Sequence, residues 1–453
     1  MPAWGADKLQ LSRTFVGRLR ENWAAPLDHS IERMATQPMT NERLIALRFF
    51  WFDGLFAAGS EAFFLNYTAL FAVAFGATNG QIGLLTALAN LAGAFALFPG
   101  ARLLETVGKR RSIVVWTGGG LGRLSILIIA IMPFLIHDSF RAVAAIIAFN
   151  CIRTFMNNLC NPAWTALVAD IIPKSMRGRY LSSRNFAMGL ATLCITPLAG
   201  WLITNGATWT GSSVFGYQIT YFLAFCVGML ATASFSRINE SEMVATGVAK
   251  AESHIGVLQM LRENRAFLGF VISAFVFNLA LQIAGPFFNV YMKNELGATA
   301  TQVGLAASIS SLSALAGQLV WGRLLDRKGS IWIQLVSGYL IPILPTLWIF
   351  YTRPEQVYIN NSFGGFLWAG YNLANFNMLL SLMPDNERPR ATALYQTVVF
   401  SSAVVGPLIG GWIADLVSFK LIFVISGVGR LLGMILFTLL TVVVVRRQKI
   451  AVN

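Results

Sequence analysis

Twelve apolar stretches, each long enough to cross a bilayer, limit what this chain can fold into. A membrane-spanning α-helix needs about 20 mainly apolar residues. The stretches run at about 45–75, 81–99, 112–136, 142–168, 182–204, 217–236, 267–292, 302–320, 331–351, 357–381, 392–414 and 419–445. Only 12% of the residues are charged, whereas soluble domains carry about 25%. The sequence therefore predicts an all-α, polytopic membrane protein.

The chain also repeats its own pattern. The segment from Arg102 to Gly108 matches the segment from Arg323 to Gly329 at a shift of 221 positions, and the same shift relates residues 76–84 to 297–305. A second pair of segments, 161–179 and 372–390, matches at a shift of 211. A register kept over about thirty residues indicates a duplication. We expect two pseudo-symmetric bundles of six helices.

Polar segments divide the chain. The predicted parts are a cytoplasmic N-terminal segment, an N-terminal bundle, a cytoplasmic linker, a C-terminal bundle and a cytoplasmic tail, at 1–43, 44–236, 237–266, 267–446 and 447–453. Apolar residues from Trp4 to Trp23 are spaced as in an amphipathic helix lying on the membrane. A flexible tail is the alternative for this first segment.

Basic residues predict the topology. Most of the 34 Lys and Arg residues fall in the two tails and in the turns after even-numbered spans. The opposite turns hold only Arg141, Lys293, Arg353 and Lys420. Cytoplasmic loops are rich in Lys and Arg, so both termini are predicted to be cytoplasmic. The two repeats then share one orientation, as do the halves of major facilitator transporters.

On these residues, the chain resembles the major facilitator superfamily over 45–445. The family signature reads roughly Gly-x-x-x-Asp-Arg-x-Gly-Arg-Arg. The second repeat fits it well, while the first has Ala101 beside Gly100 and Glu105 in place of Asp. We read both copies as charged turns, and the resemblance implies that their acidic residues lock the outward-facing state. The implied gating residues are Gly100, Arg102, Glu105, Gly108, Arg110, Gly322, Arg323, Asp326, Arg327 and Gly329. A plain solvated turn is the alternative.

A second family motif bears on the direction of transport. Antiporters of the family carry Gly-Pro-x-x-Gly-Gly in span 5, where this chain has the degraded form Thr196-Pro197-x-x-Gly200-Trp201. The fuller form, from Gly406 to Gly411, lies in span 11. The resemblance therefore weakly favours export over uptake.

Ionisable residues inside spans are functional candidates, because each costs about 2.5–3.5 kcal/mol on insertion scales. Glu61 and Asp53 lie in span 1, and we predict that they couple transport to protons. Arg123 and Arg153 reach a similar depth from opposite sides and are predicted to bind an anionic or zwitterionic substrate. A permanent structural pairing of Glu61 with an arginine is the alternative. The role of Arg430, in span 12, stays open.

Uncharged polar residues are predicted to add to the lining of the substrate site, since in lipid they must face protein or water. These are Asn157, Asn278, Gln282, Asn372 and Asn375. Contacts between helices are the competing interpretation. The three His and four Cys residues lack the spacing of a metal site, and we see neither a nucleophile–base pair nor a phosphate-binding loop. We expect no metal, no cofactor, no enzymatic activity and four free thiols.

We therefore expect a proton-coupled secondary transporter that moves a small organic solute by alternating access. The net charge of +14 reflects basic loops and not binding of nucleic acid. The alternatives are an uncoupled facilitator and a translocator of lipid-like amphiphiles of the multidrug type. The expected partners are the solute, protons and the lipid bilayer, the expected assembly is a monomer, and the expected location is a bacterial cytoplasmic membrane.

Overall fold

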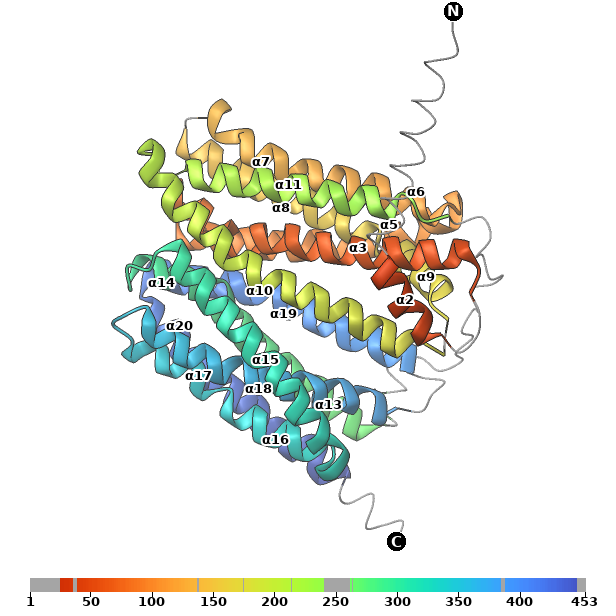
Figure 1. The fold of residues 1–453 in the computed structure, drawn as a ribbon. Helices are drawn as coiled ribbons and strands as arrows, with labels where there is room; N and C mark the ends of the chain where they lie inside the picture. Colours follow the sequence, from red (N-terminus) through yellow and green to blue (C-terminus); the bar gives the residue numbers. More distant parts are fainter. Residues whose placement is uncertain are drawn as a thin grey trace, which may run out of the picture.

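Two groups of helices make up the computed structural model (Figure 1). The structure describes residues 25–35, 39–136, 138–173, 175–212, 214–239, 261–262, 264–383 and 388–445. The amphipathic helix predicted for the first 23 residues lies outside these ranges.

The first group contains spans 1 to 6, preceded by the short helix α2 (Ala25–Met34). Span 1 is broken into α3 (Asn41–Phe64), η1 (Leu65–Tyr67) and α4 (Thr68–Ala74). The other spans follow in the order α5 (Asn79–Val107), α6 (Arg110–Trp116) with η2 (Thr117–Gly122) and α7 (Arg123–Leu135), α8 (Ser139–Leu159) with α9 (Asn161–Ile171), α10 (Arg177–Thr210), and α11 (Phe215–Phe235).

The second group contains spans 7 to 12. They are α13 (Arg265–Ala284) with η3 (Gly285–Phe287) and α14 (Phe288–Asn294), α15 (Ala300–Lys328), α16 (Ser330–Leu340) with α17 (Ile343–Leu347) and η4 (Trp348–Phe350), α18 (Glu355–Ser381), α19 (Arg388–Leu416), and α20 (Phe419–Leu436) with η5 (Phe437–Val442). Among the described residues, eleven helical segments are long and apolar enough to cross a membrane. The helix below that threshold is α18, which carries five asparagines.

The repeated sequence pattern has a local structural cause. Thr78 caps α5 by accepting a hydrogen bond from the Gln81 amide, and Thr299 caps α15 in the same way from Gln302, both at 3.2 Å. In both caps the glutamine side chain accepts a hydrogen bond from the threonine N–H, which completes a capping box. The matched Thr and Gln residues therefore start equivalent helices.

The first span of each group also breaks at the same place. The bounds of α4 and η1 lie 220 positions before those of α14 and η3. In each case one 3₁₀ turn redirects the helix before a final short segment. Residue n of span 1 is therefore equivalent, within the duplication, to residue n + 220 of span 7.

The bundles meet mainly in their predicted outer half. A shared hydrophobic cluster there joins Phe71 and Ile82 of the first bundle to Phe287 and Phe419 of the second. In the predicted cytoplasmic half, the described residues form a separate cluster in each bundle. A transporter closed on the outer side is expected to pack in this way.

Polar contacts between the bundles follow the same distribution. The Asp415 carboxylate accepts hydrogen bonds from the backbone N–H groups of Asn79 and Gly80, at 2.9 and 2.6 Å. Thr301 donates to the Thr204 hydroxyl at 3.0 Å. These contacts lie at helix ends on the predicted outer side, and they fix the outer edges of the two bundles to each other.

The interpretation of the signature segments as charged turns is wrong for most of their length. Residues 100–107 belong to α5 and residues 322–328 belong to α15. Only Gly108 and Gly329, with φ of +68° and +78°, have a positive φ, which glycine adopts without steric cost where a helix ends. The charged side chains therefore stand on the last turns of long helices.

Two adjacent glycines of α18 differ in the space around them, and this difference gives a test of the packing. A methyl group on Gly365 would overlap the backbone carbonyl of Ser310 in α15, whereas one on Gly364 would lie 3.6 Å from Leu344. We expect Gly365→Ala to lower the free energy of unfolding by about 1–3 kcal/mol through overpacking. Gly364→Ala should be neutral or stabilise by up to about 1 kcal/mol.

Denaturant unfolding of the purified protein in detergent measures both variants. Equal effects of the two substitutions would show that α15 and α18 do not approach as closely as the structure places them.

Candidate functional site

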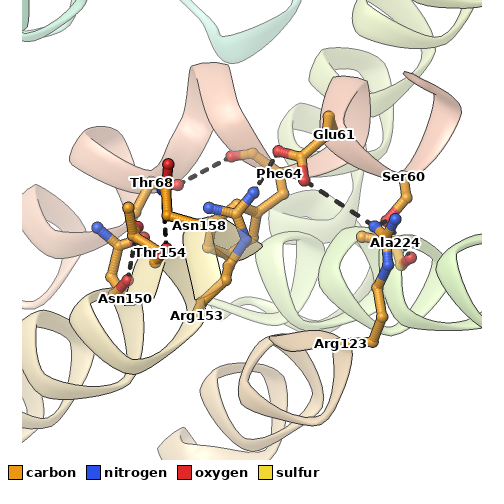
Figure 2. Close-up of polar contacts among 10 residues, drawn as sticks. All are labelled: Ser60, Glu61, Phe64, Thr68, Arg123, Asn150, Arg153, Thr154, Asn158 and Ala224. Atoms are coloured by element: carbon orange, nitrogen blue, oxygen red, sulfur yellow. Dashed lines mark hydrogen bonds and ion pairs between the residues drawn. The ribbon is translucent and has the colours of Figure 1, made fainter. Parts of the chain in front are cut away.

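Three charged side chains of the first bundle meet at Glu61, in α3 (Figure 2). Arg153 Nη2, from α8, forms an ion pair with Glu61 Oε2. Arg123 Nη1, from α7, lies 3.9 Å from Glu61 Oε1. The carboxylate is the most accessible member, with 35% of its side chain exposed against 7% for Arg153 and 13% for Arg123. The structure thus brings together the three charges that the sequence placed at similar depth.

Arg123 is positioned by an irregular stretch of its own helix. The glycine-rich turn η2 is a π-helix that ends directly before Arg123. Gly228 of α11 leaves room for the side chain, since a Cβ there would lie 2.6 Å from Arg123 Cδ. Arg123 Nη1 donates to Ser60 Oγ at 2.7 Å, and Ser60 donates to the Ala224 carbonyl at 2.7 Å. These contacts hold the guanidinium beside Glu61.

Arg153 has an aromatic neighbour in addition to its carboxylate. Its Cζ atom lies 4.6 Å from the centroid of the Phe64 ring, which is fully buried. A guanidinium over an aromatic face gains about 0.5–2 kcal/mol, depending on its exposure to water. Phe64 is three residues after Glu61, so both groups that hold Arg153 come from one face of α3. Together they compensate part of the cost of burying the charge.

Asp53 has a different partner, which the sequence analysis missed. Arg184 Nη2 lies 3.2 Å from Asp53 Oδ2, and Arg184 Nε donates to the Phe50 carbonyl at 3.1 Å. Arg184 lies two residues inside the predicted span of 182–204, but it was counted with the basic turn that precedes the span. In the structure α10 begins at Arg177 and buries Arg184.

A glycine makes this second pair possible. A Cβ on Gly54 would lie 2.5 Å from Arg184 Cζ, so a side chain at that position would displace the guanidinium. Arg184 Cζ also lies 4.2 Å from the centroid of the Phe50 ring. Asp53 and Glu61 therefore belong to two separate ion pairs on one helix.

The polar residues predicted to line the site do not gather in one place. Asn157 lies beside the glycine-rich turn η2, with its Oδ1 2.9 Å from where a Cβ on Gly122 would stand. Asn278 donates to the Ala274 carbonyl of its own helix at 2.8 Å. Asn375 donates to the Tyr395 hydroxyl at 2.7 Å. In the structure these three residues make local and interhelical contacts.

The remaining two residues differ from each other. Gln282 packs against α19, where a Cβ on Gly406 would lie 2.6 Å from Gln282 Cβ. Asn372 is exposed and lines a cavity of about 430 Å³ inside the second bundle. Pockets for small ligands usually measure about 300–1,000 Å³, so this cavity is large enough for a small solute.

The predicted gating residues lie at the predicted cytoplasmic ends of α5 and α15. Glu105 and Asp326 are exposed, and no hydrogen bond or ion pair involves either carboxylate within the described part of the chain. Arg102 stacks on Phe98, 4.4 Å from its ring centroid. Unpaired carboxylates are expected when the cytoplasmic side is open, and the gating role of these residues stays a prediction.

Other members of the signature show distinct environments. Arg110 forms an ion pair with Asp170 at the end of α9. Arg323 and Arg327 are exposed on α15. Gly322 has open space around it, whereas Gly100 packs against the Leu159 backbone of α8. Among these residues, Arg110 is the one that ties span 3 to span 4.

The Arg184–Asp53 pair gives a test of the buried charges. Arg184→Gln should lower the free energy of unfolding by about 1–3 kcal/mol, because it leaves the buried Asp53 carboxylate without its charged partner. The double variant Asp53→Asn/Arg184→Gln should recover part of this loss. Thermal unfolding of the purified variants measures both effects.

Arg179→Gln is the matched control, since Arg179 is exposed on the same helix. A loss in Arg179→Gln as large as in Arg184→Gln, or no recovery in the double variant, would contradict the pairing.

Comparison with known proteins gives the family. The sequence model described as Major Facilitator Superfamily matches residues 51–284 and 270–451. A protein of Lactococcus lactis described as a multi-drug resistance efflux pump PmrA homolog is 29% identical over 266 residues, which cover 57% of this chain and 62% of that protein. The match therefore spans less than two thirds of the Lactococcus pump.

Two further likenesses cover most of the chain. The cis,cis-muconate transport protein of Acinetobacter baylyi is 20% identical over 391 residues, or 83% of this chain and 89% of that protein. The crystal structure of the nucleoside transporter NupG superposes with a TM-score of 0.65 at 13% identity, covering 88% of this chain and 99% of that one, which is a likeness of fold. With both halves matched by the family model, this chain belongs to the major facilitator superfamily of secondary transporters.

Proposed function

We propose that this protein moves a small organic anion or zwitterion across a bacterial cytoplasmic membrane by proton-coupled alternating access. The observation that carries the proposal is the pairing of one partly accessible carboxylate, Glu61, with two guanidinium groups that are less exposed than it is. With Asp53, Arg184 and Arg430 included, four positive and two negative side chains lie at depth in the described spans. An excess of positive charge at depth favours an anionic group on the solute.

Glu61 can link proton binding to solute binding. When ionised, it holds Arg153 and competes with any anion for the guanidinium. When protonated, it releases that charge, and the free guanidinium attracts an anion. Protonation of this one carboxylate thus changes the affinity for the anion, and binding of the anion changes the affinity for the proton, which is what coupling requires. Asp53 stays a second candidate, but with 14% of its side chain exposed it is less accessible.

Joint binding of a proton and an anion is the coupling of a symporter, so an inward flow of protons would drive uptake, whereas the weak lean to export rests on the Gly406–Gly411 motif. The Gly406–Gly411 motif lies where α19 packs against α13 and α5, since Gly410 contacts Ile283 and Gly83 contacts Pro407. Close helix contacts through glycine suit a surface on which bundles rock. The relatives from Lactococcus and Acinetobacter are bacterial, one described as an efflux pump and the other as a muconate transporter. They support a bacterial location, and they are consistent both with multidrug export and with transport of an organic anion.

The coupling proposal is tested by removing the titratable group. In proteoliposomes, Glu61→Gln should abolish accumulation driven by a pH gradient and retain exchange of solute, because glutamine cannot bind and release a proton. A thermal-shift screen of matched anionic, zwitterionic and cationic solutes supplies the substrate, since ligands of the folded state stabilise it. Asp53→Asn, the same change on the same helix, should retain gradient-driven accumulation.

The outcomes separate the alternatives. Loss of both accumulation and exchange in Glu61→Gln would make Glu61 a structural brace. Loss of accumulation in Asp53→Asn alone would move the proton site to Asp53. Stabilisation by cations or neutral amphiphiles alone would favour the translocator of the multidrug type.

A further inference from the structure

The cavity of about 430 Å³ lies within the second bundle, among α13–α14, α15, α17–η4, α18 and α20. Its position is related by the internal duplication to the charged cluster of the first bundle. By the offset of 220 that relates η1 to η3, Leu281 of the second bundle is equivalent to Glu61 of the first. By the sequence registers of 221 and 211, Leu344 is equivalent to Arg123 and Gly364 is equivalent to Arg153.

All three of these equivalent residues of the second bundle line the cavity. Where the first bundle has a glutamate and two arginines, the second has two leucines and a glycine. The large charged side chains are absent, and the space that they would occupy is part of the cavity. The second bundle therefore has room for a ligand at the place where the first bundle holds its own ion pair.

One charge remains at this cavity, and it comes from a different helix. Arg430 of α20 lines the cavity and is only 2% exposed. Its Nε and Nη2 atoms are buried without a hydrogen-bond partner. Within the described ranges, no carboxylate oxygen lies within 4.0 Å of the guanidinium. Because arginine stays protonated, this is a buried cation without a counter-ion among the residues that the structure describes.

The fold keeps Arg430 pointing inward. Ser426, one turn earlier on the same face, donates to the Ala280 carbonyl of α13 at 2.6 Å. Gly429 and Gly433 lie so close to α13 that a Cβ on either would come within 2.6 to 2.8 Å of Ala280 or Phe277. Rotation of α20 would break these contacts, so the guanidinium stays inside the bundle. A buried unpaired charge is strongly disfavoured, and a bound anion would relieve it.

The other walls indicate the rest of the ligand. Trp348, Trp368 and Phe288 line the cavity with aromatic surface, and the Phe288 and Trp348 rings lie 4.7 Å apart. Asn360 lines it as well, and its Oδ1 atom is buried without a partner. Flat aromatic walls suit a flat apolar body, and a guanidinium suits a carboxylate through two parallel hydrogen bonds.

We propose that this cavity is an anion-binding site in which Arg430 receives the carboxylate of a small aromatic or otherwise planar acid. The site deepens the proposed function by naming the class of acid, and it rests on that function only for the expectation of an anionic solute. Binding here does not depend on which residue carries protons. Its test therefore reads binding and not transport, so that failure of one proposal leaves the other standing.

The test uses the full chain in lipid nanodiscs, with benzoate as probe and benzamide as its uncharged match. Benzoate should bind in calorimetry and raise the melting temperature, whereas benzamide should do neither. Arg430→Met should weaken benzoate binding at least tenfold. The same substitution should raise the melting temperature of the unliganded protein, because it removes an unpaired buried charge. Lys420→Met, which removes an exposed positive charge from the same helix, should bind benzoate as the wild type does.

A second variant tests the cavity without altering the charge. Gly364 has room for a Cβ, so Gly364→Phe should fold, occupy the cavity and also weaken benzoate binding at least tenfold. Undiminished binding of benzoate in both Arg430→Met and Gly364→Phe would overturn the proposal. An equal response to benzamide, or a melting temperature that falls in unliganded Arg430→Met, would overturn it as well, since the guanidinium would then be a structural group with a partner.

Discussion

A carboxylate held between guanidinium groups at bilayer depth is the interaction on which the first bundle depends. An ionised group in that position is costly unless it is paired. Glu61 meets this condition by drawing Arg123 from α7 and Arg153 from α8 toward α3, so one residue determines how three spans face each other. Two glycines, one on α11 and one on α3 itself, give the paired guanidinium groups of this bundle their space. Gly228 beside Arg123 and Gly54 beside Arg184 are small because a guanidinium needs the space.

The second bundle uses the same backbone for a different purpose. Its first span breaks at the equivalent 3₁₀ turn and its second span begins with the same threonine–glutamine cap, yet Leu281 stands where Glu61 would be. Without that carboxylate there is no need for two arginines beside it, and the bundle keeps a cavity whose walls combine aromatic rings, asparagines and Arg430. A duplicated fold can thus hold an ion pair in one half and leave space for a ligand in the other.

Length and pattern sufficed for the architecture, because runs of about 20 apolar residues and a repeated register leave few arrangements open. Finer features depended on tertiary context. Arg184 was missed because it was counted with the basic turn, whereas α10 begins about two turns before it, at Arg177, and buries it. The charged signature was interpreted as a turn because it is polar and bounded by glycines, but its arginine, leucine and lysine residues are good helix formers, and α15 continues through 322–328. Asn278 pairs with its own helix, an option that spacing alone cannot distinguish from a cavity lining.

The contact made by Asp415 tolerates substitution differently on its two sides. It joins the bundles on the predicted outer side by accepting from the backbone amides of Asn79 and Gly80, at the N-terminus of α5, where a negative charge is favoured. Every residue except proline supplies a backbone N–H. Almost any substitution at 79 that keeps α5 helical therefore leaves its donor in place, whereas a Cβ on Gly80 would lie 2.8 Å from Asp415 Oδ2 and would press on the carboxylate itself. The acceptor exists in one side chain only. A single substitution at 415 can therefore remove this contact between the bundles, while position 79 of α5 tolerates change.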